Sequence, residues 1–323
     1  MTQTAAWDIV VVGSANSDYL IRGPKLPQPG ETIQGETFLA APGGKGANQA
    51  VAVARLGARV AFVARIGQDE RGQTLIANLQ AQGVDTRYLI QDPHAATGVA
   101  LIMVGQGGEK QILTAPGANH QLGIADIEAA QAAIASTKVV LAQLESPLAI
   151  VQAAFQLARE AGARTVLDPA PAVPLSDELL QLIDLIRPNS SEAEVITGVK
   201  VTDPDSARQA AAILLQRGLG AVAVQAGDAG NLLIWPEGEC WLPKVPVQSI
   251  DATGAGDAFA AAIAVALAEN RPWSEAGRFA NAAAAIATTG FGAQTALPTR
   301  AAIMNLLATN PASSPVQSPS GDR

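Results

Sequence analysis

The sequence is poor in cysteine, histidine and aromatic residues, and each scarcity excludes a class of protein. Its 323 residues include one cysteine, Cys240, and two histidines, His94 and His120. A lone cysteine cannot form an internal disulfide bond, which is typical of a reducing compartment, and we expect Cys240 to be a small packing residue. Neither histidine has a partner at the spacing of a zinc site or a serine-hydrolase triad, so we expect both on the surface.

Clusters of positive charge are also missing. Lys and Arg total 21 against 29 Asp and Glu, which gives a net charge of −8 and no Lys/Arg run. Nucleic-acid binding needs clustered cations and is therefore disfavoured. Residues 1–16 lack the cationic start of a signal peptide, and the apolar run at 258–268 is too short to span a membrane. We expect a cytoplasmic protein that binds neither nucleic acid nor membranes.

Apolar β-branched runs alternate with Ala- and Leu-rich stretches along most of the chain. This alternation predicts an α/β sandwich of three layers, with a central, mostly parallel sheet and helices on both faces. The predicted strands are Asp8–Gly13, Arg59–Ile66, Lys138–Leu144, Arg164–Leu167, Leu185–Arg187, Ala221–Gln225, Asn231–Trp235 and Glu239–Pro246. The predicted helices are Lys45–Leu56, Glu70–Gln82, Pro147–Ala161, Ser190–Thr197, Asp205–Arg217, Ala258–Ala268, Ser274–Thr289 and Thr299–Leu307. Gly57, Gly83, Gly162, Gly198 and Gly218 stand where C-terminal caps belong, Ser274 where an N-cap belongs, and Gly290 at a helix stop.

Two segments interrupt the alternation and predict a small inserted sheet. Ile21–Ala41 holds three prolines before an alternating stretch at Thr32–Phe38, and residues 97–104 and 111–116 flank a glycine-rich turn as in a hairpin. The insert, near 18–42 and 97–116, could be a lid, a dimer surface, or both, or it could be a structural insertion with no such role. We expect one domain over 7–308. Residues 309–323 are rich in Ser and Pro, which predicts a disordered tail.

The segment Asp251-Ala-Thr-Gly-Ala-Gly-Asp257, which we call the anion turn, is the most informative motif. It is a glycine-rich turn that opens onto an apolar helix, so its N–H groups and the helix dipole favour an anion. The carboxylate of Asp257 would repel an anion at this place, so its presence needs an explanation. It could act as a base that takes a proton from a hydroxyl group attacking a phosphate. The turn therefore predicts phosphoryl transfer.

A second glycine cluster, Pro42-Gly-Gly-Lys-Gly-Ala-Asn-Gln-Ala50, also opens a predicted helix. It has neither Walker A nor dinucleotide-binding spacing. Its bare backbone, Lys45 and Asn48 would suit a small polar ligand, although a tight turn before a helix explains many such glycine pairs. Helix propensity gives no reason for Asn48, which favours the ligand.

Polar residues follow three further predicted strands, at the edge where open sheets bind ligands. Asn16 and Asp18 could bind sugar hydroxyls or simply form a turn. Glu145 could bind a ligand at the same edge or be an acid at the start of a helix. Asn189 and Glu192 could hold Mg²⁺ through water molecules. From the neighbouring sequence alone, an ordinary helix N-cap is the better interpretation of Asn189 and Glu192.

Together these motifs resemble the PfkB family of carbohydrate kinases, in order and from Asp8 to about Leu307. The motifs that carry the resemblance are Gly13-Ser-Ala-Asn-Ser-Asp18, Pro29-Gly-Glu-Thr32, Gly43-Gly-Lys-Gly-Ala-Asn-Gln-Ala50, Gln143-Leu-Glu-Ser146, Pro188-Asn-Ser-Ser-Glu192 and the anion turn. The third and fourth are most similar to the branch that phosphorylates ribose. Fructokinase-like and adenosine-kinase-like activities are the alternatives, with a non-catalytic ribose-binding relative as a third.

The resemblance implies ATP-dependent phosphorylation of D-ribose at O5 by in-line transfer, with Asp257 as base. A helix N-terminus would stabilise the ionised form of Asp257 and weaken it as a base, which a loose transition state tolerates. Catalytic roles are implied for Gly254, Ala255, Gly256 and Asp257, whose N–H groups would form the anion hole. Ribose-binding roles are implied for Asn16, Asp18, Gly44, Lys45, Gly46, Ala47, Asn48, Glu145 and Asp257. ATP-binding roles are implied for Asn189, Gln225, Ala226, Gly227, Asp228, Ala229, Gly230, Gly256, Asp257 and Asn281.

The resemblance further implies Mg²⁺ at Asn189 and Glu192, against the local interpretation, and a monovalent cation, usually K⁺. The cation positions are Asp251, Thr253, Ala287, Gly290, Gly292 and Ala296. Ala296 has no hydroxyl, which relatives can offer there. Three other positions differ from the residues usual in the family. Thr is usual at Ala252, Thr-Leu is usual at Gln225-Ala226, and His is often found at Asn281. The inserted strands would cover ribose and form the contact of a homodimer.

Overall fold

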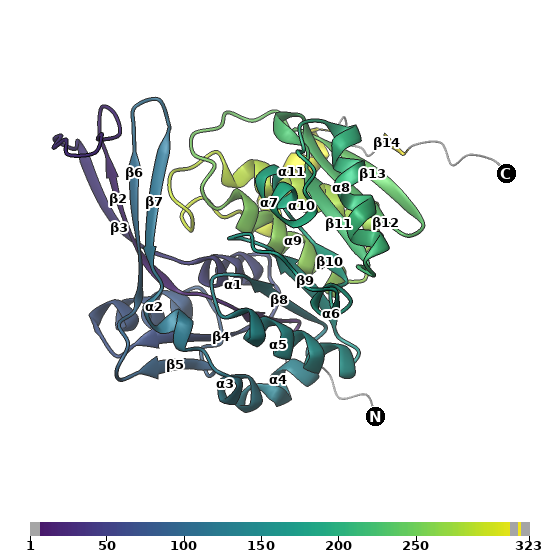
Figure 1. Ribbon diagram of the computed structural model, residues 1–323, viewed down its shortest axis with the longest axis horizontal. Coiled ribbons are helices and arrows are strands. Elements are labelled where there is room, and N and C mark those ends of the chain that lie inside the picture. The colour runs from purple at the N-terminus through teal and green to yellow at the C-terminus, as the bar shows by residue number, and fades with distance from the viewer. Residues whose placement is uncertain (1–6, 311–315, 318–323) are drawn as a thin grey trace.

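The computed structural model describes residues 7–310 and 316–317, and it has a large α/β body from which a narrow sheet projects (Figure 1). The strands are β1 Ile9–Val12, β2 Asn16–Arg22, β3 Thr37–Gly43, β4 Val60–Gly67, β5 Leu89–Asp92, β6 Gly98–Val104, β7 Lys110–Ala115, β8 Val139–Gln143, β9 Arg164–Asp168, β10 Leu185–Ile186, β11 Ala221–Gln225, β12 Gly230–Trp235, β13 Gly238–Pro243 and β14 Val316–Gln317. The helices are α1 Lys45–Arg55, α2 Glu70–Ala81, η1 Gly117–Gln121, α3 Ile124–Ala129, α4 Gln131–Ala135, α5 Leu148–Glu160, α6 Asp177–Leu180, α7 Ser190–Thr197, α8 Pro204–Gln216, η2 Gly227–Ala229, α9 Ala255–Ala268, α10 Trp273–Ala287 and α11 Arg300–Thr309.

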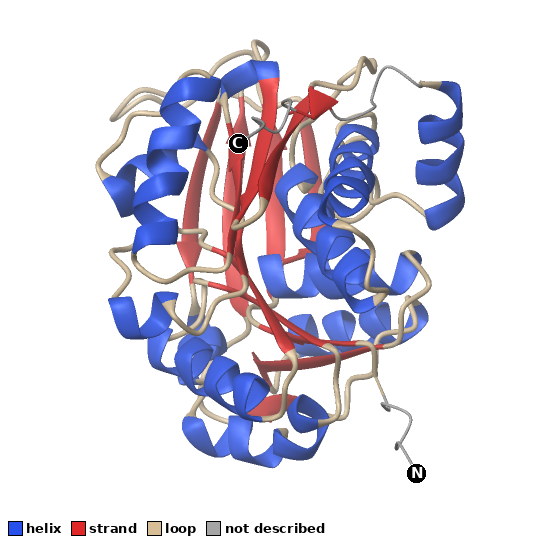
Figure 2. Cartoon of the chain, turned by 90° about the vertical axis from the view of Figure 1, so that its right-hand side faces the viewer, coloured by secondary structure: helices blue, strands red, loops and turns tan. Residues whose placement is uncertain are grey.

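The large sheet has ten strands in the order β14-β13-β12-β11-β10-β9-β8-β1-β4-β5. From β11 to β5 neighbouring strands are parallel, and β12, β13 and β14 add an antiparallel edge. Helices lie on both sides of the strands (Figure 2). The predicted fold class is therefore confirmed.

The two apolar cores follow from the strand sequences. All four residues of β1, Ile-Val-Val-Val, are buried, as a strand covered on both faces requires. Ile9 and Val11 pack in one core with α1, α2, α9, α10 and α11, whereas Val10 and Val12 pack in the other with α3 to α8. Among the residues that the structure describes, no helix is long and apolar enough to cross a membrane.

The inserted strands form a four-stranded sheet in the order β3-β2-β6-β7, which we call the small sheet. The predicted hairpin at 97–116 is confirmed as β6 and β7. The strand expected at Thr32–Phe38 was misplaced, because the pairing strand is β3, which begins at Thr37 and runs to Gly43. Asn16 and Asp18 lie in β2, not in a turn, because β2 pairs with both β3 and β6.

Several element boundaries differ from the predictions. The five predicted capping glycines all have positive φ, as left-handed caps require. However, α9 begins at Ala255 rather than Ala258, because Gly254 with φ 83° is its N-cap. The N-cap of α10 is Pro272 rather than Ser274, and α10 ends at Ala287, before Gly290. The elements β5, α3, α4 and α6 were not predicted.

Other sequence predictions concern isolated residues and the C-terminus. His94 and His120 are exposed, and Cys240 is buried in the core, as expected. Burial raises the pKa of the Cys240 thiol to about 11. Most of the segment 309–323 lies outside the described residues. Within it, Thr309 ends α11 and Val316–Gln317 pair with β13 as β14.

Candidate active site

Asp257 lies in the first turn of α9 and is held by amide donors from α1. Asn48 Nδ2 donates to Asp257 Oδ2 at 2.9 Å, and Gln49 Nε2 donates to Oδ1 at 3.0 Å. Lys45 Nζ is 3.9 Å from Oδ1. The glycine cluster at 42–50 and the anion turn, which are more than 200 residues apart in sequence, therefore meet at one carboxylate.

A chain of buried amides fixes these donors. Gln143 Nε2 donates to Gln49 Oε1 at 2.6 Å, so the Gln49 amide nitrogen must face Asp257. Gln294 Nε2 donates to Asn48 Oδ1 at 3.0 Å and orients Asn48 in the same way. Both acceptor oxygens of Asp257 are consequently held in place by neighbours that are themselves oriented.

Asp168, which the sequence analysis missed, is the second carboxylate of this cluster. It is the last residue of β9 and is fully buried. Its Oδ2 accepts from Gln49 Nε2 at 2.9 Å and is 3.4 Å from Lys45 Nζ. The signal that could have found it is its place at the carboxyl end of a parallel strand, where α/β sheets bind ligands.

Burial sets the protonation of Asp257. Desolvation is the largest influence and raises its pKa, and Asp168 raises it further, whereas Lys45, Asn48 and Gln49 oppose the rise. The net shift of the Asp257 pKa is therefore opposite to the one expected from the helix N-terminus alone, because burial is the largest influence on this carboxyl. Asp257 is a stronger base than a free aspartate.

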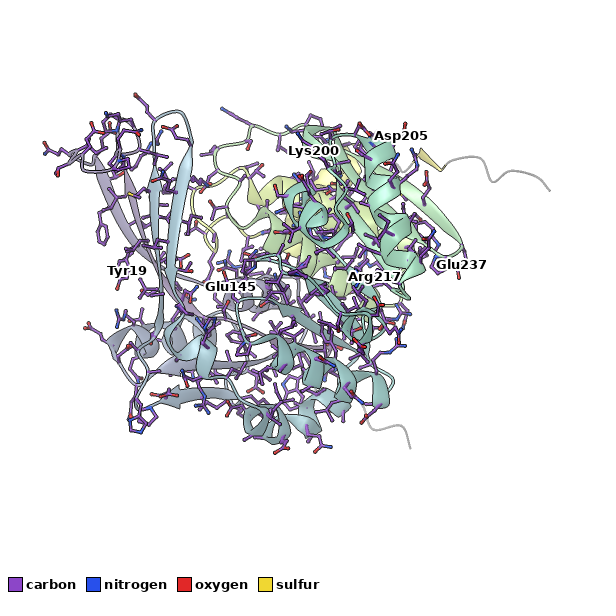
Figure 3. The ribbon with its side chains drawn as sticks, in the orientation of Figure 1. Tyr19, Glu145, Lys200, Asp205, Arg217 and Glu237 are labelled. Carbon is purple, nitrogen blue, oxygen red and sulfur yellow. The ribbon has the colours of Figure 1, made fainter. Side chains whose placement is uncertain are left out.

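The polar residues of the predicted sugar site lie around the foot of the small sheet. Asn16 Oδ1 accepts from Asn119 Nδ2 at 2.7 Å, and Asn119 in η1 is a further residue that the sequence did not reveal. Glu145 Oε2 accepts from the Ser14 hydroxyl and, at 3.1 Å, from the Lys45 backbone N–H. Glu145 lies on the side of the large body that faces the foot of the small sheet (Figure 3).

Asp18 is an acceptor without a partner. Its Oδ1 is buried and receives no hydrogen bond in the described part of the chain. Burial, with the nearby charges of Glu145 and Asp257, raises the pKa of Asp18 to about 7. A Cβ atom at Gly43 would lie 2.0 Å from Asp18 Oδ2, so glycine is needed there to admit the carboxylate. An unpaired buried acceptor of this kind suits the hydroxyl of a bound ligand.

The rest of the glycine cluster provides close backbone packing. Gly44 is the N-cap of α1 with φ 85°, and a Cβ there would lie 2.7 Å from Asn16 N. A Cβ at Gly46 would lie 2.6 Å from Ser14 N. Gly46 and Ala47 are buried in the first turn of α1. These residues bring α1 against the end of β1 and hold Lys45 at the site.

A cleft of about 570 Å³ opens on the other side of Asp257. The predicted site residues that line it are Lys45, Asn189, Glu192, Gln225, Gly227, Gly230, Gly254, Ala255, Gly256, Asp257 and Asn281. The predicted residues Ala226, Asp228 and Ala229 are next to this lining, at the end of β11 and in η2. Arg187, Asn231 and Lys244 also line the cleft and were not predicted.

Asn189 and Glu192 form the helix cap that local reasoning favoured. Asn189 Oδ1 accepts from Glu192 N, and Glu192 Oε2 accepts from Asn189 N, both at 2.8 Å. Asn189 Nδ2 also donates to Glu192 Oε1 at 2.7 Å. Burial, followed by the charge of Asp168, raises the pKa of Glu192. Within the described ranges, no group of three or more His, Cys, Asp or Glu side chains could hold a metal ion.

Asn281 is fixed at the far side of the cleft. It accepts from Asn231 Nδ2 at 2.9 Å and donates to the Pro243 carbonyl at 2.8 Å. It therefore links α10 to β12 and β13 beside η2, where the structure brings together the residues predicted to face adenosine.

Two of the predicted cation positions, Thr253 and Gly292, contact the Asp251 carboxylate. Thr253 N and Gly292 N donate to the Asp251 carboxylate at 3.0 and 3.1 Å, and Gly290 packs against Ala296. Ala287 is the last residue of α10. Lys110 Nζ, from β7 of the small sheet, lies 2.5 Å from Asp251 Oδ1. An ammonium group that the sequence analysis did not anticipate therefore contacts Asp251. Burial raises the pKa of Asp251, but hydrogen bonds from Lys110, Thr253 and Gly292 hold it at about 2.

Known carbohydrate kinases are similar to this chain over nearly its whole length. Residues 7–300 match the pfkB family carbohydrate kinases. A ribokinase of Haemophilus influenzae is 43% identical over 93% of this chain and 98% of its own, and a ribokinase of Bacillus subtilis is 37% identical over 93% and 99%. The structure of Arabidopsis thaliana ribokinase complexed with ribose and ATP is similar with a TM-score of 0.84, at 34% identity, over 94% of this chain and 99% of the other. The chain belongs to the PfkB family of carbohydrate kinases and is a kinase of the ribokinase type.

Proposed function

We propose that the enzyme transfers the γ-phosphoryl group of ATP to O5 of D-ribose, with ribose at the foot of the small sheet and ATP in the cleft. The observation that carries this proposal is the position of Asp257. Its carboxylate is bonded to Asn48 and Gln49 on the sugar side, while its backbone belongs to the anion turn on the cleft side. The ribokinase bound to ribose and ATP supports the choice of substrates.

Ribose hydroxyls would meet acceptors and donors that the structure leaves available. Asp18 Oδ1 lacks a partner and would accept from one hydroxyl. Asn16, Glu145 and the glycine cluster 44–48 would supply the other contacts, with Asn119 orienting Asn16. These groups orient the sugar so that its primary hydroxyl faces Asp257.

The reaction would proceed by in-line displacement. The O5–P bond forms as the bond from phosphorus to the ADP oxygen breaks, and the O5 proton passes to the Asp257 carboxylate. Backbone N–H groups at 254–257 would bind the equatorial phosphoryl oxygens at the N-terminus of α9. The raised pKa of Asp257 helps it accept the proton, and the charge of Lys45 opposes that rise and so favours the ionised form.

Asn189 and Glu192 would serve Mg²⁺ from the second coordination shell. Their side-chain oxygens already accept the hydrogen bonds of the helix cap, which leaves them less available as direct ligands. Contact through water molecules leaves the cap intact and matches the reluctance of Mg²⁺ to lose water. When bound, Mg²⁺ would neutralise charge on the phosphates.

A monovalent cation such as K⁺ would fit the oxygen-rich surroundings of Asp251 beside the anion turn. Backbone carbonyls at Thr253, Ala287, Gly290 and Gly292 would join the carboxylate, whereas Ala296 offers no side-chain oxygen. The cation would have to share Asp251 with the Lys110 ammonium.

The small sheet would also form a homodimer contact. Its residues Ile21, Phe38, Leu101 and Leu113 are 47%, 64%, 50% and 70% exposed. The strand register places these four side chains on one face, together with Tyr19. Tyr19 points away from Glu145 and the large body (Figure 3). A contiguous apolar face of this kind is typical of a protein contact.

The decisive experiment is an ADP-release assay with ribose, deoxyribose, fructose, tagatose and nucleosides, with and without K⁺. We expect ribose to have the highest kcat/KM. Asp257→Asn should lose about 10²–10⁴-fold in kcat while it still binds ATP, because it keeps the anion turn and removes the base. Near-normal turnover by the variant would refute the role of Asp257. Tight ribose binding without turnover of any sugar would instead favour a sensor.

A further inference from the structure

Arg187 is a buried cation that the proposed mechanism does not use. It follows β10 at the carboxyl edge of the large sheet and is 8% exposed. Its Nε is buried without a hydrogen-bond partner. Across the residues that the structure describes, its guanidinium has neither a hydrogen bond nor a carboxylate within 4 Å. The position is unusual because burying an unpaired charge is costly.

The guanidinium lies directly against the anion turn. A Cβ atom at Gly256 would be 2.8 Å from Arg187 Nη1, so the absence of a side chain at Gly256 is what admits the guanidinium. Arg187 also lines the cleft together with Asn189, Glu192 and Asp257. Its N–H groups are therefore beside the backbone that would bind the transferred phosphoryl group.

The charge balance of the site points to an anionic ligand for this residue. The ammonium of Lys45 is already compensated by Asp168 and Asp257 at 3.4 and 3.9 Å. Arg187 has no carboxylate at ion-pair distance in the described part of the chain, and only the charge of Glu192, which lies farther away, interacts with it. A planar guanidinium with several N–H donors matches phosphate oxygens well.

Packing alone does not account for Arg187. Its guanidinium carbon lies 5.2 Å from the ring centroid of Phe259, which is a cation–π contact. Arg271 and Arg300 make the same kind of contact with Phe279, at 4.7 and 5.7 Å. Both of these are also paired with Glu269. The stacked arginines outside the cleft thus have a carboxylate partner, whereas the one inside it does not.

We propose that Arg187 is a further catalytic residue, whose guanidinium binds the γ-phosphoryl group of ATP beside Gly256 and stabilises its charge during transfer. Arg187 moves no proton and forms no covalent bond. It donates hydrogen bonds to phosphoryl oxygens, while Phe259 holds the plane of the guanidinium. The transfer step rests on the proposed function, whereas the phosphate contact requires ATP binding alone.

The test compares Arg187→Met, which keeps most of the packing volume, with Arg187→Lys, which keeps the charge. The matched control is Arg271→Met, which removes a stacked arginine outside the cleft. We expect Arg187→Met to lose about 10²-fold or more in kcat/KM for ATP. It should also lose affinity for ATP, measured by calorimetry without sugar, while its affinity for AMP stays unchanged. Arg187→Lys should recover part of both losses, and Arg271→Met should retain wild-type values.

Different outcomes separate this inference from the proposed function. Suppose that wild-type protein phosphorylates ribose, and that Arg187→Met stays within about threefold of wild type in kcat/KM and in the ratio of ATP affinity to AMP affinity. The role of Arg187 is then wrong, and the proposed ribose phosphorylation stands. If no sugar is phosphorylated but Arg187→Met selectively loses ATP affinity, the phosphate contact stands and the function is wrong. If circular dichroism shows that Arg187→Met does not fold, Arg187→Lys decides the question. Kinetics and ATP affinity of Arg187→Lys that equal those of wild type and of Arg271→Met would refute a specific guanidinium contact.

Discussion

Lys45 compensates a cluster of buried carboxylates at the centre of the site. Burial disfavours its charge, but Asp168, Asp257 and Glu145 outweigh that effect and raise the pKa of Lys45 above its usual value. Lys45 therefore loses its proton less readily than a free lysine does. Its charge lowers the cost of ionising Asp257, whose burial acts in the opposite direction.

Asp18 makes the stability of the ligand-free protein depend on pH. Its pKa is about 7 in the fold, against 3.8 for an ordinary exposed aspartate, because of burial and the neighbouring charges of Glu145 and Asp257. Between these two values the unfolded chain is ionised and the native chain holds the proton, so stability falls as pH rises and levels off above pH 7. Asp18→Asn removes this loss.

We therefore expect Asp18→Asn to be more stable than wild type at pH 8, by on the order of a few kcal/mol, and close to wild type near pH 4. Urea unfolding at the two pH values measures the difference. The variant should also bind ribose more weakly, because it loses a carboxylate acceptor. A stability difference that is the same at pH 4 and pH 8 would contradict the raised pKa.

Gln49 is a positioning residue for Asp257, since it donates to both Asp257 and Asp168. Gln49→Leu removes a donor that favours the ionised form of Asp257 and should raise its pKa further. The acid limb of the kcat profile should consequently move to higher pH, with a loss of about 10-fold or more in kcat at pH 6. A purely structural role would lower kcat equally at all pH values, and the pH–rate profile separates the two cases. Gln73→Leu, in an exposed contact on α2, is the control.

At the scale of elements, the small sheet is joined to the anion turn by Lys110 in β7. Its Nζ lies 2.5 Å from both Asp251 Oδ1 and Thr253 Oγ1. This contact crosses from the strand that flanks the sugar side to the segment that would hold the phosphoryl group. It therefore couples the position of the small sheet to the geometry of the turn.

Lys110→Met should change how activity depends on K⁺. The variant frees Asp251 Oδ1 for a cation, so we expect K⁺ to activate it at a lower concentration than it activates wild type, by about threefold or more. Titration of kcat with KCl at constant ionic strength measures this. Lys138→Met, which removes an exposed pair with Asp8, is the matched control and should leave the K⁺ dependence unchanged. Equal K⁺ activation of Lys110→Met and wild type would contradict the competition.

The elements differ in how far the sequence predicts them. Buried parallel strands such as β1 and β4 are recognisable because they are continuous apolar runs, and α1 and α7 because glycine or an Asn cap marks their starts. The strand β2 is not recognisable in this way. Its polar residues Asn16 and Asp18 are typical of a turn, and they become strand residues because β3 and β6 pair with them from both sides.

The site was predictable to the extent that its residues belong to continuous motifs. Asp257, Lys45 and Asn48 lie in glycine-rich segments that have a chemical interpretation of their own. Asp168 is the last residue of β9, and Arg187 stands between β10 and the motif at 188–192, but neither residue type had a chemical interpretation of its own in the sequence. Their importance comes from burial and from neighbours that lie far away along the chain, which local patterns do not contain.

At the scale of the whole molecule, the exposed apolar face of the small sheet predicts self-association. The protomer mass is 32.9 kDa, and we expect wild-type protein to elute at twice that mass in light-scattering chromatography. Phe38→Asp combined with Leu113→Asp places charges on this face and should give the protomer mass with an unchanged circular dichroism spectrum. Met304→Asp, an exposed apolar residue on α11, is the control. A dimer that survives the double substitution would place the contact elsewhere.

The sequence by itself determined the alternation of strands and helices, the left-handed glycine caps and the positions of the glycine-rich motifs, because these depend on residues close together in the chain. The tertiary structure alone decided that Gln49 and Asp257, 208 residues apart, share a hydrogen bond. It also decided that Lys110 faces Asp251 and that the Nε of Arg187 is buried without a hydrogen-bond partner in the described part of the chain. Such properties arise from packing and desolvation, and these depend on which distant segments the parallel sheet brings to one edge.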